Sequence, residues 1–590
     1  MPVLPLPPPD IKASYEKIEY RIPMRDGVRL YTAVYVPRNA KGKFPVLMER
    51  TPYSAGPYGP DKYANFGDQT PYINAGYAFA FQDVRGCYMS EGKWENVRPL
   101  GEGKTDEATD TYDTVDYLVK QVKGNNGKVG LRGISYPGFY AAAGGINTHP
   151  ALKAISPQAP VSDWFIGDDV NHRGAFFLQD NWDFSQWFDV PRKGLEEEHK
   201  GLPDYPRGEG GAYGFFLRMV NADRLEKKVA KGRIPYWREI MKHGKYDAYW
   251  QHRSLPGKMA NVSCAVLTVG GLYDAEDMWG AFNIYRNTEV QNPTTFNVLV
   301  MGPWAHGQWY AGPANKLNGM DFDSNTGEWY RKNIEFPFFE RFLHNGPDPN
   351  IAEATVFNTG ANKWRQFGQW PPLGLKATPM YLAEGKTLVV KRPEPAGEDS
   401  YVNDPNAPTP YLAKPETPER PGGLLVQDEA WNALRADVLT FQSAPLAKSA
   451  TYGGPIDADV WVKTTGTDMD LVVKVVDVWP NGTPYAGQMR MVRSEVIRGR
   501  FRDSFTDPAP FKPGQPTLIK LRLNDILHTF GKGHRIGVML QSSWFPLVDR
   551  NPNSFIDPFT ANRRDYRKAT ITVLNGGATP SRIVFNELTE

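Results

Sequence analysis

Residues 128–146 read KVGLRGISYPGFYAAAGGI, which is an apolar strand, a glycine-rich turn and a helix of small residues. The turn Gly133-Ile134-Ser135-Tyr136-Pro137-Gly138 is close to the pattern G-x-S-x-G, in which a sharp strand-to-helix turn lifts a serine hydroxyl above the edge of a sheet. Its second glycine comes one place late, and a proline holds the usual position. We expect Ser135 to be a nucleophile; a buried serine in an ordinary strand-to-helix crossover is the alternative.

The segments around this turn alternate in the same way. Strand-like runs at 45–53 and 77–86 come before it, and residues 105–121 combine a helical spacing of apolar residues with an acidic first turn. Further strand-like runs follow at 264–271 and 296–304. This alternation predicts a parallel sheet covered by helices, which is the α/β class.

Two other regions differ in character. Residues 161–257 hold many Trp, Phe, Lys and Glu residues in helix-like stretches, which predicts a helical cap. Beyond residue 351, short strands separated by polar turns predict a β-sandwich or jelly roll. Residues 391–423 contain eight prolines and are expected to form a long surface excursion. The predicted units are an N-terminal arm (1–14), an α/β domain in two parts (15–160 and 258–350), the helical cap (161–257) and an all-β jelly-roll domain (351–590).

Candidate partners for Ser135 follow it in the chain order expected after such a turn. Asp274 ends the run VLTVGGLYD, and His306 ends the run VLVMGPWAH, so both lie at the carboxyl ends of predicted strands. Because these ends meet at one edge of a parallel sheet, the three side chains should converge into a catalytic triad. The N–H of Tyr136 and the loop that ends at Tyr53 are the expected donors to an oxyanion.

Acidic residues gather beside Asp274. Glu276 and Asp277 follow it, and Asp168 and Asp169 in the cap would face the same region. Clustered carboxylates are costly unless a cation binds, so the cluster would suit a substrate with an ammonium group near its acyl carbon. The alternative is that Glu276 and Asp277 begin a helix, where acidic residues are favoured.

The composition excludes several classes of protein. The 590 residues carry a formal charge of +2, so we expect no nucleic-acid partner, and no apolar run approaches the ~18 residues of a membrane span. Two cysteines and the absence of metal-ligand motifs predict no metal and no cofactor. The first ten residues do not resemble a secretory signal, which leaves the compartment open: periplasmic if a signal has been removed, and cytoplasmic otherwise.

The sequence resembles the α-amino acid ester hydrolases, which are serine hydrolases related to cocaine esterase and the X-prolyl dipeptidyl aminopeptidases. The resemblance runs from about residue 20 to about residue 570 and rests on IPMRDGVRLYT, RTPY, FQDVRG, GISYPGF, GDDVNHRGAF, GLYDAEDMWGA, MGPWAHGQ and HTFGKGHRIGVMLQSSWFPLVDRNPN. It implies an α/β-hydrolase domain with a helical cap, a C-terminal jelly roll and assembly as a homotetramer. It also implies roles for eight residues: the triad Ser135, Asp274 and His306, the oxyanion donors Tyr53 and Tyr136, and the ammonium-binding carboxylates Asp169, Glu276 and Asp277.

The predicted function is therefore hydrolysis of α-amino acid esters and amides, including α-amino acyl β-lactams, through an acyl-enzyme. The partners would be a small ester or amide substrate and an amine acceptor of the acyl group. A related esterase or acylase, or an X-prolyl dipeptidyl aminopeptidase with the same triad, is the first alternative. An inert protein whose jelly roll binds carbohydrate is the second.

Overall fold

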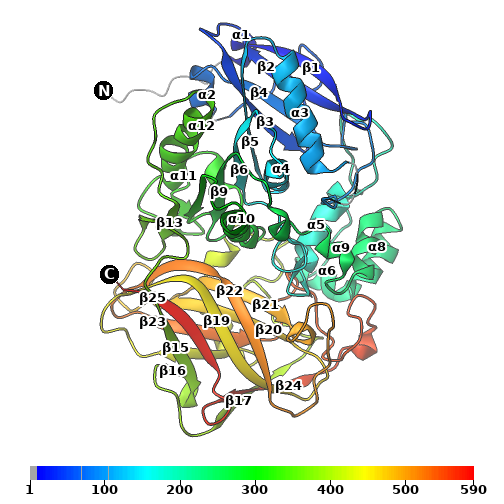
Figure 1. Ribbon diagram of the computed structural model, residues 1–590. Helices are drawn as coiled ribbons and strands as arrows, with labels where there is room; N and C mark the ends of the chain where they lie inside the picture. Colours follow the sequence, from blue (N-terminus) through cyan, green and yellow to red (C-terminus); the bar gives the residue numbers. More distant parts are fainter. Residues whose placement is uncertain (1–9, 68, 102, 104, 590) are drawn as a thin grey trace.

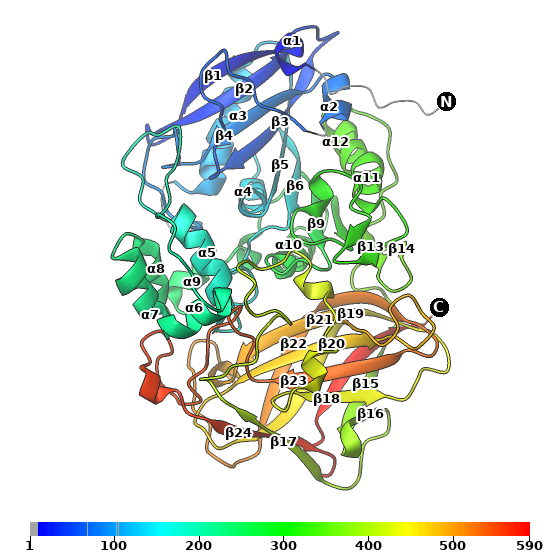
Figure 2. The same ribbon diagram turned by 180° about the vertical axis from the view of Figure 1, so that it is seen from behind.

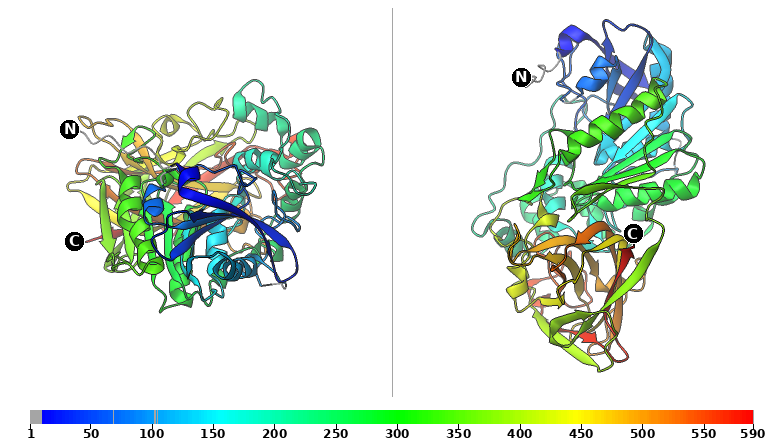
Figure 3. Two further views of the ribbon diagram at one scale, coloured as in Figure 1. Left: turned by 90° about the horizontal axis from the view of Figure 1, so that it is seen from above. Right: turned by 90° about the vertical axis from the view of Figure 1, so that its left-hand side faces the viewer.

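The computed structural model describes residues 10–67, 69–101, 103 and 105–589. Most of the predicted arm therefore lies outside the described residues; within them, Asp10 caps helix α1 (Ile11–Ser14) by accepting a hydrogen bond from the Ala13 N–H. In Figure 1 the α/β domain (the upper layer) lies above the all-β domain (the lower layer), and the helices that follow β6 lie at one side of the junction between them. The view from behind and the side view show the same stacking (Figures 2 and 3).

The described residues of the upper layer form a ten-stranded sheet in the order β1-β2-β4-β3-β5-β6-β9-β10-β13-β14. The strands from β4 through β3, β5, β6, β9 and β10 to β13 are parallel, and antiparallel strands flank them at both edges. The bounds are β1 (Tyr15–Pro23), β2 (Arg29–Pro37), β3 (Phe44–Thr51), β4 (Ala78–Asp83), β5 (Asn125–Ile134), β6 (Leu152–Gln158), β9 (Ala265–Gly271), β10 (Asn297–Gly302), β13 (Ala354–Asn358) and β14 (Lys363–Phe367).

Helices cover both faces of this sheet. On one face of β5, Leu131 lies against α4; on the other, Gly130 leaves room for Phe339 and Leu343 of α12. The predicted helix at 105–121 is α3, which begins at Asp106 with a reciprocal side-chain cap involving Thr109. The bounds are α2 (Thr70–Asn74), α3 (Glu107–Gln121), α4 (Tyr136–Gly145), α10 (Met278–Gln291), α11 (Thr326–Tyr330) and α12 (Phe336–Leu343), with a short hairpin of β11 (Lys316–Leu317) and β12 (Met320–Asp321) before α11.

Between β6 and β9 the regular elements are mainly helices, in the region 161–257 where the sequence predicts a helical cap, and loops join them. This region packs aromatic side chains inward, among them Trp182 and Trp237, whose ring centroids lie 5.1 Å apart. The bounds are β7 (Asn171–His172), β8 (Ala175–Phe176), α5 (Leu178–Phe188), α6 (Gly211–Met219), α7 (Ala222–Leu225), α8 (Pro235–Lys242) and α9 (Ala248–Gln251).

The lower layer is all β, and in the described residues its eleven strands surround a separate apolar core. The burial of alternate residues along β19 follows the two-residue period of a strand with one face on that core. The bounds are β15 (Leu375–Ala383), β16 (Thr387–Val389), β17 (Gly397–Asn403), β18 (Leu439–Ser443), β19 (Ala450–Thr464), β20 (Asp470–Val478), β21 (Met489–Arg498), β22 (Thr517–Phe530), β23 (Arg535–Gln541), β24 (Ala569–Asn575) and β25 (Arg582–Leu588).

Two expectations differ from the structure. The β domain was expected to begin at residue 351, but β13 and β14 continue the upper sheet because β13 pairs in parallel with β10. Residues 391–423 were expected to be a surface excursion, but β17 pairs with β24, and Tyr411 is buried. Prolines exclude a helix there, yet they do not prevent an edge strand or a packed loop.

Within the described part of the chain, no helix is long and apolar enough to cross a membrane.

Candidate active site

Ser135 lies at the tip of a strained turn between β5 and α4. Its backbone has φ 68° and ψ −128°, which non-glycine residues seldom adopt. The Ser135 N–H donates to Gln158 O at 2.9 Å, and the Ser135 carbonyl accepts from the Phe139 N–H at 3.1 Å. These contacts hold the serine at the carboxyl edge of the sheet, in the position that the sequence predicted.

The glycines on either side allow this turn to close. A Cβ on Gly133 would lie 2.4 Å from the Pro137 carbonyl carbon, and one on Gly138 would lie 2.5 Å from Gln158 O. Both positions therefore exclude side chains, although the second glycine is one place later than in the usual pattern. Pro137 is accommodated because it lies in the first turn of α4, where a missing N–H breaks no helical hydrogen bond.

Asp274 and His306 are joined directly. His306 Nδ1 lies 2.9 Å from Asp274 Oδ2, and the Asp274 side chain is buried. The other oxygen, Oδ1, accepts the N–H groups of Glu276 and Asp277 at 2.8 and 3.2 Å. Asp274 is thus fixed by the turn that follows β9 and can hold the imidazole in one orientation.

The two predicted donors to the oxyanion, Tyr53 and Tyr136, line the same cavity as Ser135. Burial together with the Asp169 charge raises the pKa of Tyr53, so its proton is retained. The Tyr136 side chain points away, because its hydroxyl donates to Asn96 Oδ1 and accepts from the Val97 N–H. The Tyr136 N–H opens α4 and is one of the N–H groups without an intrahelical acceptor.

The predicted carboxylates take three different positions. Asp169 and Glu276 line the cavity that contains Ser135. Asp277 does not: it is buried, both its oxygens lack hydrogen-bond partners among the described residues, and Oδ2 lies 4.0 Å from His306 Nδ1. Asp168 is also buried, where it accepts N–H groups of Ser162, Asp163 and Gly280 and so braces the start of the cap.

The cavity above Ser135 has a volume of about 460 Å³. Its walls come from the turn after β3, the turn at Ser135, the cap, the turn after β9 and a loop of the β domain. It is lined by Tyr53, Ser135, Tyr136, Trp164, Asp169, Val170, Asp180, Asn181, Asp183, Phe184, Ser185, Trp187, Tyr236, Glu276, Glu419 and Arg420.

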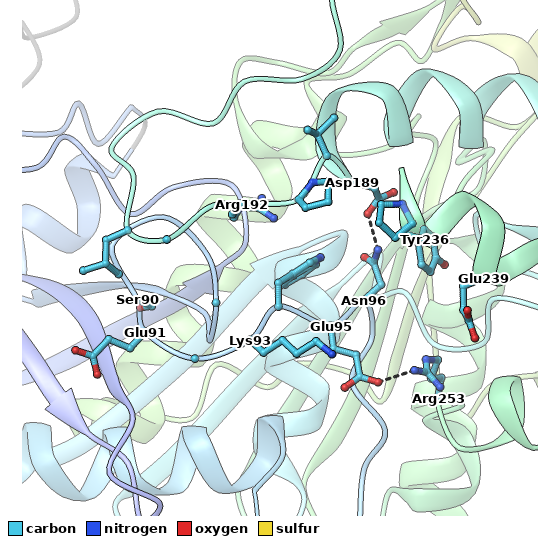
Figure 4. Close-up of a pocket in the computed structure, with 18 of the residues that line it drawn as sticks. Ser90, Glu91, Lys93, Glu95, Asn96, Asp189, Arg192, Tyr236, Glu239 and Arg253 are labelled. Atoms are coloured by element: carbon cyan, nitrogen blue, oxygen red, sulfur yellow. Dashed lines mark hydrogen bonds and ion pairs between the residues drawn. The ribbon is translucent and has the colours of Figure 1, made fainter. Parts of the chain in front are cut away.

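Tyr236 also lines a larger cavity of about 830 Å³. Figure 4 shows two contacts among its side chains: the Asn96 amide donates to Asp189, and Arg253 pairs with Glu95. Because Ser135 does not line it, we assign the chemistry to the smaller cavity.

Negative charge dominates the surroundings of His306. Burial alone would lower the pKa of His306, but Asp274 and Glu276 outweigh it and raise that pKa to about 10. Burial and the neighbouring carboxylates raise the pKa values of Asp169 and Asp277 well above their usual range. In the described residues His306 makes no hydrogen bond to Ser135; its Nε2 lies 3.5 Å from Glu276 Oε2 instead.

Comparison with known proteins identifies the family of the chain. Residues 26–308 match the family model described as X-Pro dipeptidyl-peptidase (S15 family), and residues 351–584 match the X-Pro dipeptidyl-peptidase C-terminal non-catalytic domain. The chain is 35% identical to the solved structure of an α-amino acid ester hydrolase, with a TM-score of 0.91 over 99% of this chain and 100% of the other. It belongs to the S15 family of serine hydrolases.

Two further relatives place the S15 hydrolase among esterases and peptidases. An aminopeptidase from the marine sediment archaeon Thaumarchaeota archaeon is 33% identical, with a TM-score of 0.91 over 100% of this chain and 99% of the other. The cocaine esterase of Rhodococcus sp. (strain MB1 Bresler) is 26% identical over 90% of this chain and 92% of its own. The α/β-hydrolase fold with an all-β C-terminal domain and the resemblance to α-amino acid ester hydrolases are confirmed.

Two charged residues that line the cavity, Arg420 and Asp180, were not predicted from the sequence. Arg420 reaches in from the β domain, where its Nη2 is bonded to Glu276 Oε1, and its Nε lies 2.6 Å from Asp180 Oδ2 of α5. Neither residue lies in a motif, and their pairing joins segments that are far apart in the chain. In the described residues no group of three His, Cys, Asp or Glu side chains could hold a metal ion.

Proposed function

We propose that this serine hydrolase cleaves α-amino acid esters and amides through an acyl-enzyme. The observation that carries the proposal is the presence of Asp169 and Glu276 in the same cavity as Ser135. A carboxylate that faces a serine nucleophile would repel an anionic acyl group and attract an ammonium group attached near the scissile carbonyl.

The proposed reaction uses five groups. Ser135 Oγ attacks the carbonyl, His306 Nε2 accepts the serine proton, and Asp274 holds the imidazole through Nδ1. The Tyr53 hydroxyl and the Tyr136 N–H donate to the oxygen that becomes negative. His306 then protonates the leaving alcohol or amine, and water or a second amine attacks the acyl-enzyme. Attack by a second amine would make the enzyme an acyltransferase. The proposed amide substrates include α-amino acyl β-lactams.

Of the three predicted carboxylates, Asp169 is best placed to receive the ammonium group. Glu276 is already bonded to Arg420, and Asp277 is buried and does not line the cavity. Asp169 is half-buried, lines the cavity and makes no ion pair within the described residues. Burial, and then the charge of Glu276, raises the pKa of Asp169, and a substrate cation would oppose both effects by favouring the carboxylate.

An X-Pro dipeptidyl-peptidase is the second candidate, because the matching family model carries that description. Both candidates need a substrate with a free amino terminus, so the length of the released acyl group separates them. Single amino acids released from a peptide panel support the first, and X-Pro dipeptides support the second. A homotetramer remains part of the proposal, and light scattering of the purified chain would measure it.

Replacing Glu276 by glutamine should move the pH midpoint for labelling of Ser135 to lower pH. Glu276 stabilises the charged form of His306, so its removal lowers the pKa of His306, and neutral imidazole then forms at lower pH. The measurement is the rate at which a fluorophosphonate labels Ser135, which reports the base of the free enzyme. The midpoint should fall from about 10 by at least about one unit; an unchanged midpoint would contradict the assignment.

Replacing Asp169 by asparagine tests the ammonium site. Asn tolerates the left-handed backbone of this residue, where φ is 41°, so the variant should fold. Loss of a charge-assisted contact should raise KM for an α-amino ester by about 10- to 100-fold with little change in kcat. Glu419→Gln, the same charge change at an exposed residue of the same cavity, is the control and should change KM by less than about twofold. Equal effects from the two variants would rule out a specific contact at Asp169.

A further inference from the structure

A loop of the β domain supplies a positive charge to the proposed catalytic centre. Arg420 lies between β17 and β18, and its side chain is 13% exposed. It bridges Asp180 of the cap and Glu276 of the turn after β9. One arginine therefore ties together the three parts of the chain that enclose the cavity.

Through this bridge Arg420 limits how closely Glu276 approaches His306. Glu276 Oε1 is bonded to Arg420, while Oε2 lies 3.5 Å from His306 Nε2, which is beyond a good hydrogen bond. The Nδ1 nitrogen of the same ring is already engaged by Asp274. Nε2 is thus the nitrogen left to accept the Ser135 proton, and a full hydrogen bond to Glu276 would occupy it.

We propose that Arg420 is a positioning residue for this chemistry: it holds Glu276 away from His306 Nε2, so that this nitrogen stays available to Ser135. The proposal deepens the proposed function and rests on its catalytic triad. Arg420 itself touches neither the reacting serine nor the imidazole; it acts through Glu276.

The charges that face His306 explain why a restraint is needed. Asp274, Glu276 and Asp277 approach it from the turn after β9, Asp169 faces it from the cap, and Arg420 lies behind Glu276 on the β-domain side. Without the guanidinium, Glu276 would have its strongest available partner in the imidazolium. The charged form of His306 would then be favoured further, and its pKa would rise.

Labelling of Ser135 by a fluorophosphonate between about pH 6 and pH 11.5, a range that extends above the wild-type midpoint, tests this proposal in the full chain. We expect Arg420→Met to slow labelling near neutral pH by about 10-fold or more and to raise the pH midpoint. Arg420→Lys, which keeps a cation, should recover part of the rate. In the background of Glu276→Gln, adding Arg420→Met should change the rate by less than about threefold, because the carboxylate to be restrained is gone.

The controls separate a positioning role from a structural one. Lys414→Met removes an exposed cation from the same segment and should leave labelling unchanged. If thermal melting shows that Arg420→Met is not folded, the labelling rates of Arg420→Lys and Arg420→Lys/Glu276→Gln are compared instead. Labelling of Arg420→Met at the wild-type rate, or an equal slowing with and without Glu276, would overturn the proposal.

Failure of the proposed function would look different. Labelling requires no ammonium group on the probe. If Arg420→Met slows labelling as expected but α-amino and N-acetyl esters are turned over equally, the proposed substrate preference is refuted and the role of Arg420 stands. Absence of labelling at Ser135 in the wild-type enzyme would refute the triad and the role of Arg420 together.

Discussion

Replacing Ser135 by alanine is expected to reduce ester turnover by a factor on the order of 10⁵, because the attacking oxygen is removed while the oxyanion donors remain. The change keeps the Cβ, so the strained turn at Ser135 is neither relieved nor worsened. The measurement is the initial rate of hydrolysis of an α-amino ester, corrected for the uncatalysed reaction.

The control for Ser135→Ala is Ser400→Ala in β17, where the serine is exposed and far from the cavity in the fold. This variant should retain full activity. Mass spectrometry should also find the fluorophosphonate adduct on the peptide that contains Ser135 in the wild-type protein. Residual activity of Ser135→Ala within about 100-fold of the wild type would show that another residue is the nucleophile.

Replacing Asp274 by asparagine is expected to lower kcat by about 10⁴-fold. The amide oxygen can still accept the N–H groups of Glu276 and Asp277, so the turn after β9 should persist. What is lost is the carboxylate that accepts the His306 Nδ1 proton at 2.9 Å and stabilises the imidazolium. The kcat is measured with saturating α-amino ester near the pH optimum of the wild type.

A second histidine–carboxylate pair provides the matched control. In the β domain His534 Nδ1 lies 2.8 Å from Asp477 Oδ1, and both side chains are buried. Asp477→Asn makes the same chemical change in a similar pair outside the catalytic domain, so it should leave kcat within about twofold even if it lowers the melting temperature. A comparable loss of kcat in both variants would mean that Asp274 acts through stability alone.

Much of the catalytic machinery could be predicted from the sequence because it is local. The strand, the turn and the helix around Ser135 are contiguous, and Asp274 and His306 each follow an apolar strand. Chain order and the shared carboxyl edge of a parallel sheet then bring the three residues together without knowledge of the rest of the fold. The structure joins Asp274 to His306 directly and places Ser135 at the predicted turn.

The direction of individual side chains could not be predicted. Glu276 and Asp277 are neighbours in the chain, yet Glu276 lines the cavity and Asp277 is buried away from it. Two adjacent residues at the start of a helix point to different sides, and only the packing around α10 decides which side is open. The sequence therefore predicts an acidic cluster but not which of its members can touch a ligand.

Contacts between the domains were also beyond prediction. Arg420 lies in a proline-rich stretch with no regular period, and its pairing with Glu276 depends on how the β domain packs against the α/β domain. The end of the first domain shows the same difficulty, because β13 and β14 look like the strands that follow them. Periodicity identifies a strand, but its place in a sheet depends on pairing over long distances.

The most direct test of the central claim compares phenylglycine methyl ester with its N-acetyl derivative. The two esters share the acyl carbon, the phenyl group and the leaving methanol, and they differ in whether an ammonium group is present. Because Asp169 and Glu276 face Ser135 across one cavity, we expect kcat/KM to be at least about 100-fold higher for the free amino ester. Equal values of kcat/KM for the two esters would contradict the claim that the acidic cluster selects the substrate.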